Sequence, residues 1–330
     1  MRARGRVAVV LIGVFVAFLL IGILHTPEKT SALRVSLDFF VNPNHVPLVV
    51  CRELGFFAEE GLEVEWFVPA DPSDPVKLAA SRAVEVALTP QINYLIARSE
   101  GLPLIAIGAL IEHGLGGLLS LRQHGVETID DLHGKRIGYS LAPLEPILWR
   151  TMLDCAGIDE SEVRLIHVGF NTMQALLAGS VDAIGAFRNF EPIQAALEGG
   201  DPVFFPQEAY CIPETYELIF VVHPDLIAER GEELAAFLRA LAGGVERTTS
   251  GPDAAFATFL EAYPDLDDEL NRRSFEATLP LYAEGARHDE PNVWSVMRDF
   301  LVEHGLIDER LRIEELFTDA LLPVGAQRGG

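Results

Sequence analysis

The chain has little cysteine and a deficit of basic residues. Three cysteines occur among 330 residues, at Cys51, Cys155 and Cys211, and no C-x-x-C spacing joins them. Three are too few for a disulfide scaffold and match no zinc or redox motif, so we expect them to be small, buried, apolar side chains. Basic residues number 25 against 49 acidic ones, which gives a net charge of −24. Such an acidic surface repels phosphate backbones and excludes nucleic acid as a partner.

The short motifs of common enzymes are also missing. No G-x-S-x-G, P-loop, G-x-G-x-x-G or H-E-x-x-H sequence occurs in the chain. His113, His124 and His133 lie at spacings that match no metal template. No nucleophile and base form a recognisable pair. We therefore expect no metal, no cofactor and no enzymatic activity, and a protein that binds its ligand without converting it.

The first 32 residues have the pattern of an export segment. Arg2, Arg4 and Arg6 precede residues 7–24, which contain no polar side chain. A basic start followed by an apolar run indicates a signal peptide or a signal-anchor. The length favours an anchor in the inner membrane but leaves a cleaved signal open. Either way, we expect the rest of the chain to be periplasmic or otherwise extracytoplasmic.

The remaining chain alternates between short apolar strands and helical patterns. Ten strands are predicted between residues 34 and 223, with helices such as 47–57 among them, whereas residues 224–319 are almost wholly helical. Such alternation predicts an α/β fold with largely parallel sheets, here two α/β lobes joined by a hinge. The chain is expected to cross near Ser120–Gly125 and to return near Glu214–Val222. The expected boundaries are 33–120 for the first part of lobe 1, 121–214 for lobe 2, and 215–330 for the return to lobe 1 with a helical tail.

Aromatic and amide side chains follow several of the predicted strands, where open α/β sheets bind their ligands. The first strand leads into a stretch that contains Phe39, Asn42 and His45. A turn in which Asn42 or Asn44 caps the next helix explains the asparagines, but the aromatic residues and the histidine exceed what a cap requires. Other strand ends carry Thr89, Gln91 and Tyr139.

The strand end at residues 187–192 is the most informative. Glu191 precedes a proline, which is typical of a carboxylate at the start of a helix. The same placement can direct Glu191 into a cleft, where Phe187 or Phe190 offers a flat face and Asn189 adds a hydrogen-bonding group. A planar heterocycle that bears an amine suits such a site. Both interpretations are open on the sequence alone.

Five stretches carry a family resemblance: LDFFVNPNHVPLVVCRELGFFAEEGLEVE (37–65), VALTPQINYLIARSEGLPLIAIGALI (86–111), GKRIGYS (134–140), VDAIGAFRNFEP (181–192) and IPETYELIFVV (212–222). In them the chain resembles the thiamin-pyrimidine-precursor binding proteins of ABC importers, which are related to the yeast-type pyrimidine synthase. The resemblance implies a type II periplasmic-binding-protein fold, a small heteroaromatic ligand, and a permease and an ATPase as partners. It implies ligand contacts at Phe39, Asn42, His45, Thr89, Gln91, Tyr139, Asn189, Glu191, Tyr216 and Glu217.

The chain departs from the family pattern at several positions. Arg188 stands where the family commonly has an aromatic residue, which removes a stacking face or indicates a ligand with an anionic group. The synthase branch uses a lysine and a histidine where this chain has Thr89 and Asn93, and a cysteine-rich motif where it has Cys211 alone. Without the lysine no Schiff base can form, which argues against a synthase.

The sequence therefore predicts a solute-binding protein that captures a thiamin pyrimidine precursor. Two alternatives are open: the same fold binding riboflavin or a sulfonate-like anion held by Arg188, and a pyrimidine-forming enzyme.

Overall fold

The computed structural model describes residues 32–71, 73–140, 142, 144–169, 171–288, 290–307 and 311–323. The predicted export segment, including the apolar run at 7–24, lies outside the described residues. Among the helices that are described, none combines the length and the apolar character needed to cross a bilayer.

The first sheet contains five strands, of which four run in one direction and one runs antiparallel between two of them. Its order is β2 (Val64–Phe67), β1 (Leu33–Ser36), β3 (Val86–Thr89), β10 (Leu218–Val222) and β4 (Ile105–Ile111). β1 runs parallel to β2 and β3, whereas β10 is antiparallel to β3 and β4. Every residue of β3 and β10 is buried. Continuous apolar strands of this kind require helices on both faces of the sheet.

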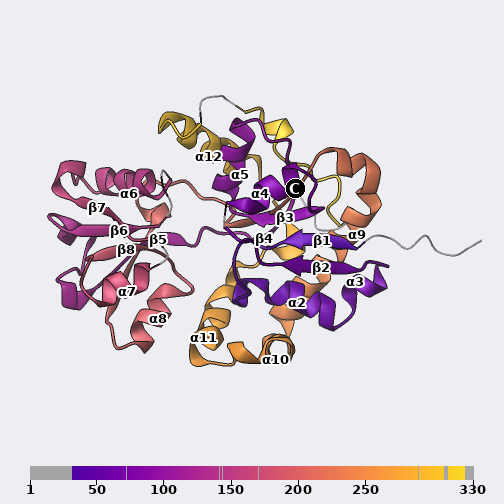
Figure 1. Cartoon of the computed structure of the whole chain (residues 1–330), viewed down its shortest axis with the longest axis horizontal. Coiled ribbons are helices and arrows are strands. Elements are labelled where there is room, and N and C mark those ends of the chain that lie inside the picture. Colours follow the sequence, from indigo (N-terminus) through magenta and orange to yellow (C-terminus); the bar gives the residue numbers. More distant parts are fainter. Residues whose placement is uncertain are drawn as a thin grey trace, which may run out of the picture. The chain divides into compact units, whose positions relative to one another are not determined.

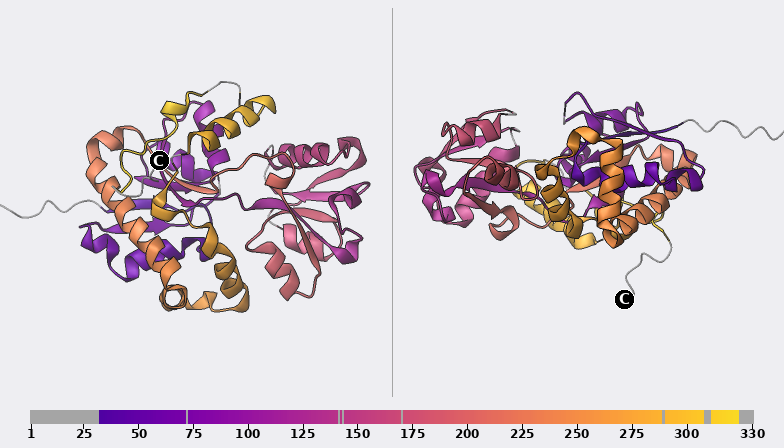
Figure 2. Two further views of the ribbon diagram at one scale, coloured as in Figure 1. Left: turned by 180° about the vertical axis from the view of Figure 1, so that it is seen from behind. Right: turned by 90° about the horizontal axis from the view of Figure 1, so that it is seen from below.

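Helices cover both faces of the first sheet (Figure 1). One face packs against α4 (Asp74–Ala80), α5 (Gln91–Ser99) and α12 (Pro291–Glu303), where the rings of Tyr94 and Trp294 lie 5.9 Å apart. The other face packs against α2 (Val46–Glu53), α9 (Asp225–Ser250) and α10 (Pro252–Ala262). The helical tail, in orange and yellow, thus packs mainly on the first sheet (Figure 2). We call the first sheet with these helices the first lobe.

The helix predicted over residues 47–57 is divided in two. α2 ends at Glu53, and α3 (Phe56–Glu59) follows it. Between them Gly55 has φ +85°, in the left-handed region that glycine enters without a steric penalty. The apolar periodicity that continues into Phe56 and Phe57 therefore belongs to a separate helical turn.

The second sheet repeats the same arrangement and forms the second lobe. Its order is β7 (Arg164–His167), β6 (Arg136–Tyr139), β8 (Ala183–Phe187), β5 (Gly116–Leu121) and β9 (Pro202–Pro206). β6 is parallel to β7 and β8, and β5 is antiparallel to β8 and β9. One face packs against α6 (Leu144–Cys155), and the other packs against α7 (Thr172–Leu177) and α8 (Glu191–Leu197).

The first crossing between the lobes comes earlier than predicted. The boundary at residue 120 placed β5 in the first lobe, but β5 pairs along its length with β8 and β9 of the second sheet. The chain therefore leaves the first sheet between Ile111 and Gly116, and it returns between Pro206 and Leu218. β4 and β5 are equally apolar, and nothing local in either strand encodes the partner with which it pairs. Gly117 supports the pairing, because a Cβ there would collide with the carbonyl oxygen of Phe205 on β9.

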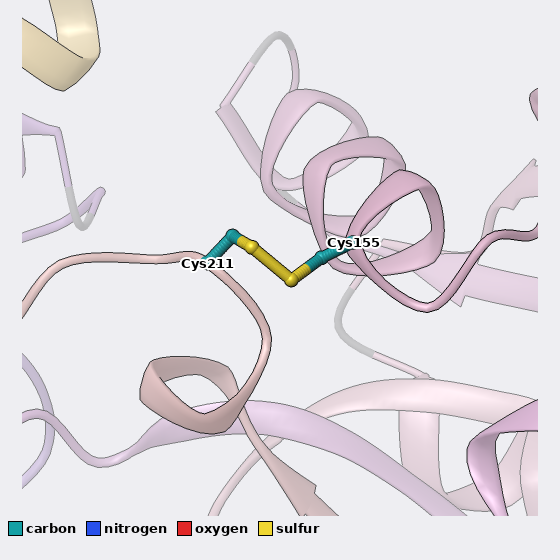
Figure 3. The surroundings of a disulfide bond; sticks show 2 residues. All are labelled: Cys155 and Cys211. Carbon is teal, nitrogen blue, oxygen red and sulfur yellow. A yellow bond between two sulfur atoms is a disulfide. The ribbon is translucent and has the colours of Figure 1, made fainter.

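The expectation of three buried thiols is wrong for two of the cysteines. Cys51 on α2 is buried, and its thiol donates a hydrogen bond to Ala240 O over 3.1 Å. Cys155, at the end of α6, forms a disulfide with Cys211, which lies between β9 and β10 (Figure 3). The two cysteines are 56 residues apart, and such a separation gives no sequence signal of contact.

We predict that the disulfide stabilises the fold by restricting the unfolded chain. For a closed loop of 56 residues, replacing Cys155 and Cys211 together by alanine should lower the free energy of unfolding by about 2–4 kcal/mol. Dithiothreitol should lower the denaturation midpoint of the native chain in the same way. The Cys51→Ala variant serves as the control, because it should keep its sensitivity to dithiothreitol. A native chain whose midpoint is unaffected by the reductant would contradict the prediction.

Candidate functional site

The loop between β1 and α2 is held by its own polar side chains. Asn42 caps the 3-10 turn η1 (Pro43–His45): its Oδ1 accepts a hydrogen bond from Asn44 N over 2.8 Å. His45 is buried, and its Nδ1 accepts a hydrogen bond from Asn42 N over 3.2 Å. The proton of the neutral imidazole therefore lies on Nε2, which donates a hydrogen bond to Asp38 Oδ1 over 2.8 Å. The structure thus gives Asn42 a capping role and uses His45 to position the Asp38 carboxylate.

Two phenylalanines of the same loop are left uncovered. Phe39 is 42% exposed and Phe40 is 66% exposed, with their rings edge to face at 5.1 Å. Among the described residues, no hydrogen bond or ring contact joins Phe39 to Asn189 or Glu191. These two rings are therefore available to pack against a molecule from outside the chain.

Gln91 lies buried where β3 passes into α5, next to the segment that returns from the second lobe. Its Oε1 accepts hydrogen bonds from Thr215 Oγ1 over 2.7 Å and from Tyr216 N over 3.2 Å. The amide nitrogen Nε2 of Gln91 is also buried, but it has no hydrogen-bond partner among the described residues. A buried donor without a partner costs free energy, so this position suits a ligand acceptor. Thr89 is buried at the end of β3, opposite Ile219.

Glu217 joins the two segments that connect the lobes. It is 7% exposed at the edge of β10, and its Oε2 accepts a hydrogen bond from Leu115 N over 2.7 Å. The pKa of Glu217 is raised to about 7, mainly by burial and in part by the charge of Asp38, while the hydrogen bond from the Leu115 amide and the charge of Arg188 oppose the shift. The neighbouring Tyr216 is buried against Trp294 and accepts a hydrogen bond from Glu290 N over 3.2 Å.

Glu191 begins α8 and bonds back to the end of β8. Its Oε2 accepts a hydrogen bond from Phe187 N over 2.7 Å. Burial is the largest influence on its pKa and raises it, and the nearby carboxylate of Glu145 acts in the same direction. Glu145 itself accepts a hydrogen bond from Ser140 N at the end of β6. Tyr139, which ends β6, is half-buried with its ring 5.2 Å from that of His167. The ends of β6 and β8 therefore bring two carboxylates close together.

Asn189 connects the strand ends of the two lobes. It is 2% exposed, and its Nδ2 donates hydrogen bonds to Asn44 Oδ1 and to Thr278 Oγ1, both over 2.8 Å. Asn44 belongs to η1 of the first lobe, and Thr278 ends α11 (Glu269–Thr278) of the helical tail. Both amide hydrogens of Asn189 are thereby used within the protein, and Oδ1 is the atom left to meet a ligand.

Arg188 is paired with a carboxylate. Its Nη2 lies 2.6 Å from each oxygen of Glu208, in the short segment η5 (Gln207–Ala209) that follows β9. Its backbone N donates a hydrogen bond to Leu115 O over 2.9 Å, which places Arg188 and Glu217 on the two sides of Leu115. The Nε of Arg188 is buried and has no hydrogen-bond acceptor in the part of the chain that the structure describes. Phe190 is half-buried at the N-cap of α8.

The structure thus brings many of the predicted residues together around the two connecting segments. Several functional candidates were not identified from the sequence: Asp38, Glu145, Glu208 and Thr278. Asp38 and Glu145 stand directly beside predicted strand ends, so their position was a usable signal. Thr278 and Glu208 carry no local signal, because the pairing of each is set by the fold. No group of three His, Cys, Asp or Glu side chains able to hold a metal ion occurs in the described part of the chain.

We predict that Glu217 makes the stability depend on pH near neutrality. Because its folded pKa of about 7 exceeds the ordinary 4.5, the folded state retains a proton that the unfolded chain releases between those values. The stability from this group is present below pH 4.5 and is lost as the pH rises through 7. Relative to Glu217→Gln, the native chain should lose roughly 2–3 kcal/mol of unfolding free energy across this window, at about 1.4 kcal/mol for each pKa unit.

Urea denaturation at several pH values between 4.5 and 8 measures this difference. Glu214→Gln is the matched control, because Glu214 is an exposed carboxylate in the same returning segment and its variant should follow the native chain. Parallel pH profiles for the native chain and Glu217→Gln would refute the prediction.

Comparison with known proteins shows the family to which the chain is related. A family model described as NMT1/THI5 like matches residues 42–255. A protein of Haemophilus influenzae named for thiamine biosynthesis is 36% identical over 87% of this chain and 91% of the relative. The formylaminopyrimidine-binding protein of Halalkalibacterium halodurans is 32% identical over 88% of this chain and 91% of the relative. A protein of Legionella pneumophila named 4-amino-5-hydroxymethyl-2-methylpyrimidine phosphate synthase is 27% identical over 89% of this chain and 93% of the relative.

Solved structures show the same architecture. The periplasmic aliphatic sulphonate binding protein of Escherichia coli has a TM-score of 0.70 with 14% identity, over 92% of this chain and 96% of that chain. The described part of the chain therefore has the α/β periplasmic-binding-protein fold that the sequence predicts.

Proposed function

The chain belongs to the NMT1/THI5-like family, and we propose that it is a solute-binding protein that captures a thiamin pyrimidine precursor between its lobes. The contact of Asn189 with Asn44 and Thr278 carries the structural part of this proposal. It places the loop after β8 directly against the loop after β1, so a ligand beside Asn189 would meet strand ends of both lobes. The name of the formylaminopyrimidine-binding relative supports the class of ligand.

The chemistry of the site suits an aromatic ring that carries amino groups. Phe39 and Phe40 offer exposed flat faces, and the carboxylate of Glu191 can accept a hydrogen bond from an exocyclic amine. Gln91 supplies a buried donor that a ring nitrogen can satisfy. In this proposal Phe190, Tyr139 and Thr89 shape the walls, while Asn42, His45, Tyr216 and Glu217 hold the loops and connecting segments that carry the contact residues.

The residues that differ from the synthase branch favour a protein that binds its ligand without converting it. A relative named as a pyrimidine phosphate synthase is similar to this chain over 89% of the chain's length. This chain has Thr89 and Asn93 where the synthase resemblance requires a lysine and a histidine. A threonine cannot form a Schiff base with an aldehyde cofactor. We therefore propose no catalytic residue and no cofactor.

A binding protein of this kind delivers its ligand to an ABC permease with its ATPase. In this proposal the two lobes therefore lie outside the cytoplasmic membrane. The basic and apolar pattern of residues 1–32 supports export, with residues 7–24 as a signal or an anchor. The disulfide between Cys155 and Cys211 adds independent support, because structural disulfides are typical of extracytoplasmic compartments.

Calorimetric titration of the purified full chain tests the ligand class. A formylaminopyrimidine should give saturable binding at a single site, whereas riboflavin and ethanesulfonate should give none. Saturable binding of riboflavin or of the sulfonate with no pyrimidine binding would replace the proposed ligand by one of those alternatives. Absence of binding by all three would refute the proposal.

The Glu191→Gln variant tests how the ligand is held. If Glu191 accepts a hydrogen bond from the exocyclic amine, the variant should bind the pyrimidine more weakly by about 1.5–3 kcal/mol, the range for charged hydrogen bonds. Glu198→Gln, at the other end of α8, removes the same charge and should bind like the native chain. Equal affinities in the two variants would show that Glu191 serves only the start of the helix.

A further inference from the structure

We propose that Glu208 determines the charge selectivity of this site: by neutralising Arg188, it makes the site accept an uncharged aminopyrimidine and reject the phosphate ester of the same ring. This inference rests on the proposed function and names its substrate class more narrowly. The partner of Glu208 is Arg188, which stands where the family pattern has an aromatic residue.

Arg188 lies at the centre of the connecting region. It follows β8 directly, and it precedes Asn189, which contacts the first lobe. Its backbone is bonded to Leu115, whose own N–H is bonded to Glu217. Its charge also lowers the pKa of Glu217, against the larger effect of burial. A guanidinium in this place would attract an anionic ligand if nothing compensated its charge.

Glu208 supplies that compensation. Both of its carboxylate oxygens lie 2.6 Å from Nη2 of Arg188, and the two side chains are only 29% and 26% exposed. The pair is therefore partly shielded from water, which strengthens it relative to a surface ion pair. The ring of Phe204 lies 6.0 Å from the guanidinium carbon and adds to the fixed position of the arginine. The nitrogen Nε is buried and meets no acceptor among the residues described, so it can donate to a neutral acceptor of a ligand.

Several carboxylates also lie near the strand ends of the described residues. In the first lobe, Glu217 lies close enough to both Asp38 and Arg188 to feel their charges, and Glu191 and Glu145 follow the strands of the second lobe. With Arg188 paired, a phosphate would meet these groups without a free cation to receive it, and like charges at short range are unfavourable. An amine or a neutral hydroxyl meets no such penalty.

A matched pair of ligands isolates the phosphate. The alcohol 4-amino-5-hydroxymethyl-2-methylpyrimidine and its monophosphate share one ring, and the monophosphate is the product in the names of the synthase relatives. Calorimetry on the full native chain should find the phosphate at least tenfold weaker than the alcohol. In Glu208→Gln the arginine is released to bind the phosphate, so the ratio of the two dissociation constants should fall at least tenfold.

Two further variants separate the specific pair from a general change of charge. Glu214→Gln removes one carboxylate from the returning segment without touching Arg188, and it should keep the native ratio. In the double variant Arg188→Gln with Glu208→Gln, the gain in phosphate affinity should disappear, because the cation that receives the phosphate is gone.

The outcomes distinguish this inference from the function on which it rests. Failure of the native chain to bind the alcohol would overturn the proposed function. Binding of the alcohol with an unchanged ratio in Glu208→Gln would overturn the inference alone. An equal fall of the ratio in Glu214→Gln, or a gain that persists in the double variant, would also overturn it.

Discussion

The connection between the two lobes depends on how the backbone of Leu115 is bonded. Its N–H donates to the carboxylate of Glu217, and its carbonyl oxygen accepts from the backbone of Arg188. One residue of the outgoing segment is thereby tied to the returning segment and to the loop after β8. These three pieces of chain are far apart in sequence. These hydrogen bonds restrict the backbone at this point, and several polar residues of the candidate site lie close to it.

Charge is distributed unevenly around that junction. Carboxylates end or follow β1, β6 and β8, and burial keeps two of them, Glu191 and Glu217, closer to the protonated form than exposed carboxylates would be. The one arginine of the described junction is paired with Glu208. The region therefore combines uncharged donors and acceptors with little net positive potential, a setting that favours neutral polar heterocycles over anions. The likeness to a sulphonate-binding protein concerns the fold alone.

Much of this architecture can be predicted from the sequence, and the features that could not be predicted have a common cause. The strands were predicted because apolar runs and turn residues are local signals, and the capping role of Asn42 was among the interpretations for the same reason. The sheet to which β5 belongs, the bond between Cys155 and Cys211, and the partners Glu208 and Thr278 all depend on contacts between distant segments. The spacing of residues along the sequence does not predict contacts of this kind. At the candidate site, the sequence indicated loops that follow strands, but it could not tell a side chain that is available to a ligand from one already bonded within the protein, as with Asn189.

The disulfide limits where the chain can bend between the two lobes. It fastens the residue that ends α6 to Cys211, so the first half of the returning segment is anchored to the body of the second lobe. Bending of that segment is then confined to Ile212–Tyr216, while the outgoing segment offers only the residues between Ile111 and Gly116. Each of the two segments that join the lobes therefore has only a short stretch that is free of strand pairing and of the disulfide. Any movement of one lobe relative to the other must be absorbed by the backbone dihedral angles of these two stretches.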